Sequence, residues 1–96
     1  MKRPKTYFDV LMKNDKFREA FEKEYSKIVI SEKIAKLRKE ANLTQEALAK
    51  KIHTTKSAIS RYESASYSGY TVSLLEKIAY ACGAKMDINF KRPIHV

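Results

Sequence analysis

The chain has little of what several protein classes require. It contains one cysteine, so no internal disulfide can form, which excludes a disulfide-stapled secreted scaffold and favours a reducing cytoplasm. Two glycines and two prolines are too few for the turns of many short strands, which favours helices. No apolar run approaches the roughly 18 residues of a membrane span, and the basic residues 1–5 precede mixed polarity rather than a signal-peptide core. We therefore expect a soluble, cytoplasmic, helical protein.

Positive charge is in excess. The 96 residues carry 20 Lys and Arg against 11 Asp and Glu, a formal net charge of +9, while 44% are hydrophobic, enough for one small folded domain. The excess is spread along the chain rather than gathered in a tail, at +3 in residues 1–30, +4 in 31–70 and +2 in 71–96. Such a field suits a phosphate backbone, an anionic lipid surface or an acidic protein. Charge alone does not choose among these partners.

The N-terminal third predicts an amphipathic helix that begins at Asn14, a residue type that caps helices with its side-chain oxygen. At helical spacing, one side is apolar and a second side is acidic. The apolar stripe consists of Phe17, Phe21, Tyr25 and Ile28, and the acidic one of Asp15, Glu19 and Glu22. The apolar stripe either packs on the core of its own chain or binds a partner. The β-branched run 28–30 and a new cap at Ser31 predict a helix break near residues 28–31, with one continuous helix as the alternative.

Four further helices follow from cap and stop residues. We expect the first from Ser31 to Asn42 and the others to begin at Thr44, Thr55 and Thr71, with stops near His53 and at Gly83. Residues 85–90 then alternate polar and apolar with a period of two, which predicts a short strand. A single strand has no partner within the chain. It lies on the helices, extends into solvent or pairs with another chain, and the last option suits a homodimer.

Residues 43–63 carry the most specific pattern: a capped helix, a tight turn and a second capped helix, with a small residue, Ala47, expected where the two helices cross. This stretch resembles the Cro/C1-type (XRE) helix-turn-helix repressors, from its Leu-Thr-Gln start to its Ser-x-x-Ile-Ser-x-x-Glu second helix, and the resemblance covers about residues 31–83. It implies an all-α fold. We expect a four- to five-helix helix-turn-helix domain with an additional N-terminal helix and one short C-terminal strand.

The resemblance also implies a site that binds double-stranded operator DNA. In it, Gln45 bonds a phosphate at the start of the first motif helix. Lys56, Ser57 and Arg61 present base-reading groups, since Lys and Arg donate to guanine. Thr55 and Ser60 lie near the DNA backbone. The chain departs from the family at the turn, where His53 stands in place of the usual glycine.

The flanks of the motif resemble the HigA-type antitoxins, which are paired with RelE-like (HigB-like) mRNA-cleaving toxins. This resemblance implies a toxin-binding extension at residues 1–30, which would use the apolar and acidic stripes, a DNA-binding domain at 31–83 and a dimer contact in 84–96. A basic toxin is not an obvious electrostatic match for a chain of +9. The alternative is a stand-alone phage-type or housekeeping regulator of the XRE family without a toxin.

The remaining candidate residues point to structure rather than to chemistry. His53 and His95 have no Cys, Asp or Glu at ligand spacing, so we expect no metal and no cofactor. We expect packing for Cys82 and hydrogen bonding at a helix end for Glu63. Tyr67 and Tyr70 either touch the DNA backbone or cover the core. An RNase toxin would need a sheet with convergent acid and base groups, so we expect no enzyme.

Overall fold

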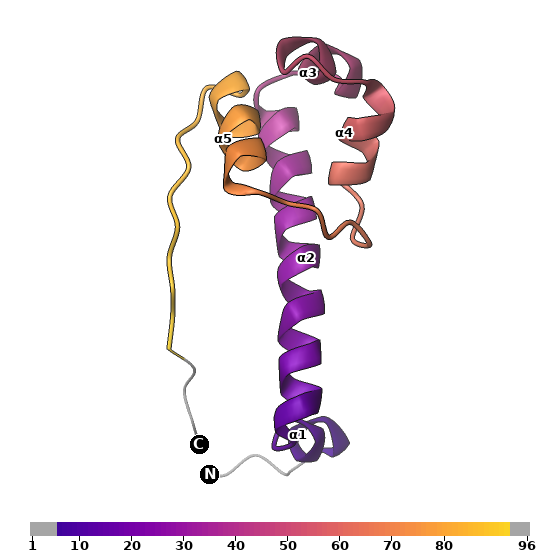
Figure 1. Ribbon diagram of the computed structural model, residues 1–96, viewed down its shortest axis with the longest axis vertical. Coiled ribbons are helices and arrows are strands. Elements are labelled where there is room, and N and C mark those ends of the chain that lie inside the picture. Colours follow the sequence, from indigo (N-terminus) through magenta and orange to yellow (C-terminus); the bar gives the residue numbers. More distant parts are fainter. Residues whose placement is uncertain (1–5, 93–96) are drawn as a thin grey trace.

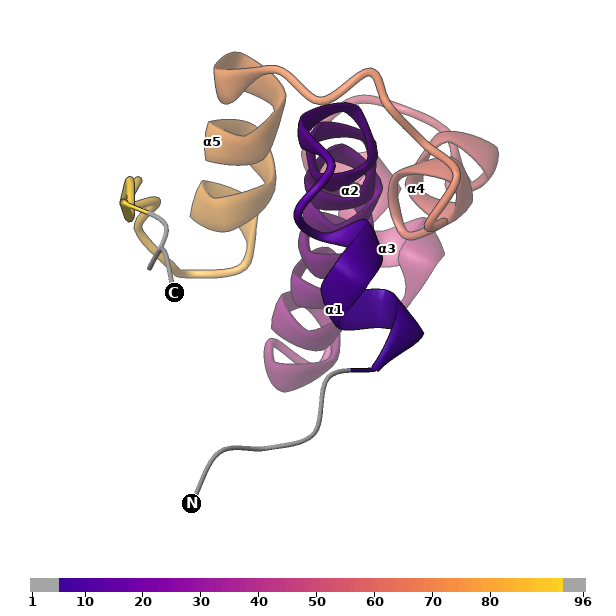
Figure 2. The same ribbon diagram turned by 90° about the horizontal axis from the view of Figure 1, so that it is seen from below.

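The computed structural model describes residues 6–92 and contains five helices in that range, an all-α fold as expected. They are α1 (Tyr7–Leu11), α2 (Asp15–Glu40), α3 (Gln45–Lys51), α4 (Lys56–Tyr62) and α5 (Val72–Ala81). With 26 residues, α2 is the longest element, about 39 Å at 1.5 Å per residue. Its C-terminal half lies between α5 on one side and α4 on the other, whereas its N-terminal half extends away from them toward α1 (Figures 1 and 2).

The predicted caps are confirmed at four helices. The side chains of Asn14, Thr44, Thr55 and Thr71 each accept a hydrogen bond from the backbone N–H three residues on, at 3.0–3.1 Å. Each satisfies an N–H that the first turn of a helix leaves without an internal partner. The predicted stops are confirmed as well, and three residues take positive φ after helix ends. These are Asn42 (58°), His53 (58°) and Gly83 (73°).

The predicted break near residues 28–31 is wrong, because α2 runs through it without interruption. Ser31 does not cap a new helix. Its hydroxyl donates to the backbone carbonyl of Ile28 at 2.8 Å, and the side chain is buried. Ile30 packs against the core, so burial offsets the weak helix propensity of its β-branched side chain. The alternative of one continuous helix is therefore the observed one.

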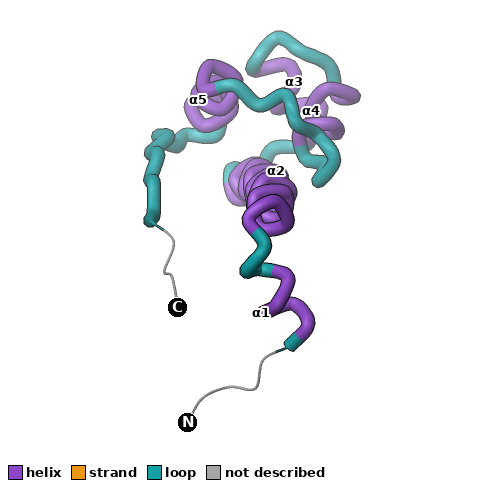
Figure 3. The backbone as a smooth tube through the Cα atoms, turned by 60° about the horizontal axis from the view of Figure 1, so that its bottom comes forward, coloured by secondary structure: helices purple, strands orange, loops and turns teal. Residues whose placement is uncertain are grey.

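The predicted strand at residues 85–90 is also wrong for the isolated chain. Residues 84–92 form an extended segment with no regular structure, and Figure 3 marks no strand in the described part of the chain. Alternation gives a segment the side-chain pattern of a strand, but a strand exists only where a second one bonds it. One helix, α1, was not predicted; a capping box between Thr6 and Asp9 begins it.

The core joins the C-terminal half of α2 to the three short helices. Its buried cluster consists of Ile34, Leu48, Ala49, Ile59 and Ile78. The small residue buried on α3 is Ala49, at 2% exposure, rather than the expected Ala47, which is half-buried. The apolar stripe of the N-terminal half of α2 does not belong to this cluster. Among residues 6–92, no helix is long and apolar enough to cross a bilayer.

Candidate nucleic-acid interface

Helices α3 and α4 pack on each other through small and branched residues, with the turn at His53 between them. Ala49 on α3 and both Ala58 and Ile59 on α4 are buried at 3% exposure or less. This close packing fixes the direction of α4 relative to the rest of the domain. The other side of α4 is left uncovered at the end of the molecule where α3 and α4 lie (Figure 1).

Four of the predicted DNA-binding side chains lie on this uncovered side of α4. Lys56, Ser57, Ser60 and Arg61 are all exposed. At about 100° per residue they fall on one side of the helix, opposite Ala58 and Ile59. Of the other two, Thr55 is exposed and its hydroxyl caps α4. Gln45 is half-buried at the first position of α3.

A network centred on Glu63 holds Gln45 beside the end of α4. Both nitrogens of the fork formed by Nε and one Nη of Arg38 donate to the Glu63 carboxylate, at 2.6 and 3.0 Å. The amide nitrogen of Gln45 donates to the same carboxylate at 3.3 Å, and Arg38 also donates to the carbonyl of Leu43 at 2.9 Å. The hydrogen bond to Glu63 raises the pKa of Arg38, so the guanidinium group stays positively charged.

The network gives Glu63 a structural role and shows that Arg38, which was not predicted from the sequence, is its main partner. The side chains of Arg38 and Glu63 are only 11% and 8% exposed, so the pair ties the end of α2 to the end of α4. This agrees with the structural role expected for Glu63. Arg38 was missed because 25 positions separate the two residues and no local spacing connects them.

Three tyrosines fix the loop that leaves α4. Tyr67 lies between Tyr62 and Tyr70, with edge-to-face ring contacts at centroid distances of 5.2 and 4.8 Å. The hydroxyl of Tyr70 donates to the carbonyl of Tyr62, and burial raises the pKa of Tyr70. Gly69 lets the Tyr67 ring approach, because an added Cβ would lie 2.6 Å from its hydroxyl oxygen. Of the two alternatives, these contacts favour a role in covering the core.

The aromatic stripe of α2 forms a second, separate cluster with α1. The Phe8 ring contacts the rings of Phe17 and Phe21 at 6.5 and 5.2 Å between centroids, and Phe21 stacks with Tyr25 at 6.1 Å. The cluster is open to solvent, with Phe21 38% and Tyr25 57% exposed. Ile28, the last member of the stripe, is 39% exposed. We call this surface the aromatic face.

The acidic stripe lies mostly in solvent beside the aromatic face. Asp15 pairs with Arg18 at 2.7 Å, three positions along the helix. Glu19 and Glu22 are exposed. The structure thus places the stripe at the surface of α2 and leaves its carboxylates accessible.

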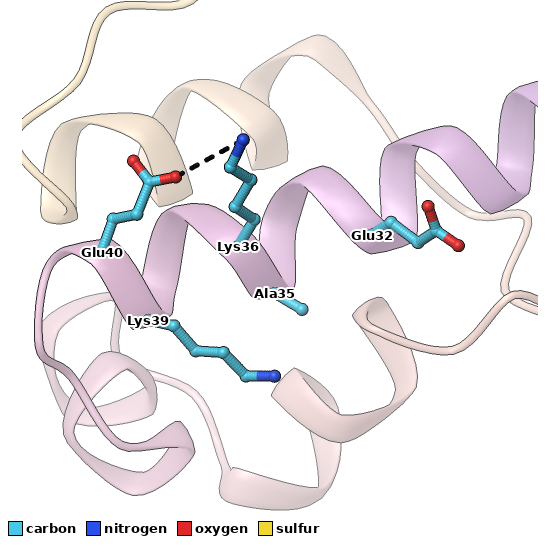
Figure 4. Close-up of a pocket in the computed structure, with 5 residues that line it drawn as sticks. All are labelled: Glu32, Ala35, Lys36, Lys39 and Glu40. Carbon is cyan, nitrogen blue, oxygen red and sulfur yellow. Dashed lines mark ion pairs between the residues drawn. The ribbon is translucent and has the colours of Figure 1, made fainter.

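A shallow hollow on the outer side of α2 is distinct from both surfaces. Figure 4 shows its lining, in which Lys36 is directed at Glu40 in an ion pair of 3.8 Å. The other lining residues are Glu32, Ala35 and Lys39. All five belong to one helix and their charges are mixed, so the hollow does not form an enclosed ligand site.

Three candidate residues remain, His53, His95 and Cys82. Within residues 6–92, no three His, Cys, Asp or Glu side chains gather around a point where a metal ion could bind. His53 is exposed in its turn, and His95 lies outside the described residues. Cys82 packs against the core, and burial raises the pKa of its thiol.

Comparison with known families agrees with this geometry. The family model described as helix-turn-helix matches residues 34–88, more than half of the chain. The match begins within α2 and ends in the extended C-terminal segment, so the aromatic face lies outside it. No curated protein and no solved structure shows a significant match.

Proposed function

Since the chain belongs to the XRE-type helix-turn-helix family of DNA-binding transcriptional regulators, we propose that it is a repressor that reads a specific double-stranded operator with α4. The observation that supports this is the division of α4 into a buried side and an exposed side of cationic and hydroxyl groups. Binding would take place in the cytoplasm. No catalytic role is proposed.

In this proposal the exposed residues have separate roles. Lys56 and Arg61 donate to guanine in the major groove, and Ser57 makes a weaker, more permissive contact. Thr55 and Ser60 lie against the DNA backbone. Gln45 donates one amide hydrogen to Glu63, so the second remains for a phosphate oxygen.

An electrophoretic shift titration on operator and random duplex tests this assignment. Arg61→Ala should weaken operator binding by about 1–3 kcal/mol and random binding little, because a base contact is lost. Gln45→Ala should weaken both, since a phosphate contact carries no sequence information. Lys36→Ala, on the outer side of α2, is the matched control and should change neither. Wild-type affinity of Arg61→Ala for both duplexes would contradict the base-reading role.

We further propose that the DNA-bound form is a two-fold homodimer. One recognition helix covers a few base pairs, so two copies must span half-sites about 34 Å apart. Residues 85–90 are the proposed contact, because they extend from α5 with their apolar side chains Ile88 and Phe90 exposed. Deletion of residues 85–96 should lower both the sedimentation mass and the operator affinity. If both stay at the wild-type value, another surface forms the dimer.

A second candidate function is that of an antitoxin, and the aromatic face is the observation that favours it. A partner with an apolar groove and basic rim would cover the face and meet Asp15, Glu19 and Glu22. The resemblance to HigA-type antitoxins supports a RelE-like toxin as that partner, with autorepression of a shared operon.

Copurification tests the antitoxin candidate. The protein is purified together with the product of an adjacent reading frame that encodes a small basic RNase-like chain. The wild-type protein should retain this partner, and Phe17→Ala with Phe21→Ala should lose it while DNA affinity stays unchanged. If partner binding survives the double change, the aromatic face is not the surface that binds the partner. Absence of any such partner would leave the stand-alone regulator.

A further inference from the structure

The extended C-terminal segment presents an unpaired backbone on the outer side of α5. Figures 1 and 2 both show it running apart from α2. In the described residues no backbone hydrogen bond joins positions 85–92 to another element; the last one is from Ala84 to Ala79. Ile88 is 54% and Phe90 95% exposed. Backbone groups and apolar side chains are therefore both available to a second strand.

Alternation assigns the side chains to two sides. In an extended chain successive side chains point in opposite directions, so Met86, Ile88 and Phe90 share one side. Asp87, Asn89 and Lys91 share the other. Met86 is half-buried and lines a groove along α5 with Tyr80, which is 86% exposed. The apolar side of the segment thus begins beside the exposed Tyr80 of α5, in a groove whose lining also includes Glu76 and Lys77.

From this pattern we infer that two copies of the chain pair their C-terminal segments as antiparallel strands centred on Asn89. In this register Ile88 lies opposite the partner's Phe90, and Asp87 lies opposite the partner's Lys91. Two-fold symmetry repeats each contact, so Ile88 and Phe90 meet on one side, flanked by Met86 opposite the partner's Arg92, and opposite charges meet on the other side. The inference rests on the proposed homodimer and specifies the register of its contact.

Neighbouring registers are less complementary. With Ile88 at the centre, Lys85 lies opposite the partner's Lys91 and Asp87 loses its cationic neighbour. With Asp87 at the centre, two carboxylates face each other. Parallel pairing in register places every residue opposite its own copy and so sets Asp87 against a carboxylate and Lys91 against an amine. With Phe90 at the centre, Ile88 lies opposite the partner's Arg92 and Asp87 has no cation opposite it. Like charges directly opposite each other destabilise a strand pair, so the register centred on Asn89 is the favoured one.

Disulfide trapping measures the register directly. In a full-length Cys82→Ala background, Asn89→Cys should form a disulfide-linked dimer on mild oxidation, because residues directly opposite lie within the 4.4–6.8 Å Cα separation, on the order of 5 Å, that a disulfide accepts. Asp87→Cys is the matched control, since position 87 of the two copies would lie about 13 Å apart along the strands. A mixture of Asp87→Cys and Lys91→Cys chains should cross-link again. We expect Asn89→Cys, and the mixture of Asp87→Cys with Lys91→Cys, to give at least tenfold more cross-linked dimer than Asp87→Cys alone.

Sedimentation of the same proteins separates the register from the dimer itself. A dimer that cross-links through Ile88→Cys or Asp87→Cys, but not through Asn89→Cys, would overturn the register and leave the homodimer intact. A dimer that cross-links at none of these positions would remove the segment from the interface. A protein that stays monomeric on its operator would overturn both proposals. In a dimer, Asp87→Lys should weaken association, and adding Lys91→Asp should restore it; failure of that rescue also contradicts the pairing.

Discussion

Three hydrogen bonds converge on the carboxylate of Glu63, two from Arg38 and one from Gln45. Removing the carboxylate leaves the little-exposed Arg38 cation without its partner, so Glu63→Ala should lower the free energy of unfolding by about 3–5 kcal/mol. Glu40→Ala, which breaks the exposed Lys36–Glu40 pair, should change it by less than about 0.5 kcal/mol. Urea unfolding checks both variants. Equal effects would show that burial does not distinguish the two pairs.

His53 carries a backbone cost that a glycine would remove. Its φ of 58° places a side chain with a Cβ in the left-handed region, which is unfavourable for most residues. His53→Gly should therefore stabilise the protein by about 0.5–1 kcal/mol, despite the larger entropy of glycine in the unfolded chain. Asn42 has the same φ, but asparagine tolerates it, so Asn42→Gly should have a smaller effect. Thermal unfolding of both variants compares them; a larger gain at Asn42 would contradict the strain at His53.

Two half-buried side chains, Cys82 and Tyr70, predict a loss of stability in alkali. Burial raises the pKa values of Cys82 and Tyr70 in the folded protein, so each stays protonated at a pH where the unfolded chain ionises. Their contribution is complete below about pH 8 and is lost as the pH rises from about 8.5, first for the thiol and then for the phenol. The measurement is the unfolding free energy between pH 7 and 10.5. Cys82→Ala should flatten the first part of the decrease in unfolding free energy with pH. If the decrease is the same as in the wild type, groups other than Cys82 cause it.

At the scale of elements, short-range chemistry was readable from the sequence and long-range packing was not. Caps such as Thr44 and Thr55 act within four residues, so their identity and position suffice to predict helix starts. The exposed residues of α4 were predictable in the same way, from the period of the helix. Arg38 was not, because its partner is brought near only by the fold. Ser31 failed as a cap because burial and a bond to the preceding turn outweighed its local preference.

The aromatic face gives a prediction that separates α2 into a structural half and an accessible half. Phe17 and Phe21 lie outside the core cluster, so replacing both with alanine should cost less than about 1.5 kcal/mol, mainly the aromatic contacts with Phe8. Ile34→Ala, in the buried half, should cost about 2–5 kcal/mol. Denaturant unfolding measures both. If the double change costs as much as Ile34→Ala, the aromatic face is structural, and a partner would have to bind elsewhere.

At the scale of the whole molecule, charge is divided between the two ends of α2. Residues 7–30 contain five basic and five acidic residues and so carry no net charge, whereas residues 31–96 contain twelve and six, a net +6. The cationic excess of the described chain therefore lies with the helix-turn-helix part, and the N-terminal half of α2 extends away from α3 and α4 (Figure 1). This division is what a DNA-binding end and a neutral, partner-accessible end would require.

The division predicts which lysines set the salt dependence of DNA binding. Each phosphate contact contributes about −0.9 to the slope of log K against log salt concentration, because binding releases condensed counterions. In its guanine contact the Lys56 ammonium also lies within the charge field of the flanking phosphates, so Lys56→Ala should reduce the slope by at most about 0.9 per bound chain, or twice that for a dimer. Lys23→Ala removes the same charge from the neutral end of α2 and should leave the slope unchanged. Shift titrations on one operator duplex between about 50 and 200 mM salt give both slopes. A reduced slope for Lys23→Ala would place the N-terminal half of α2 against the DNA and contradict the division of the molecule into two ends.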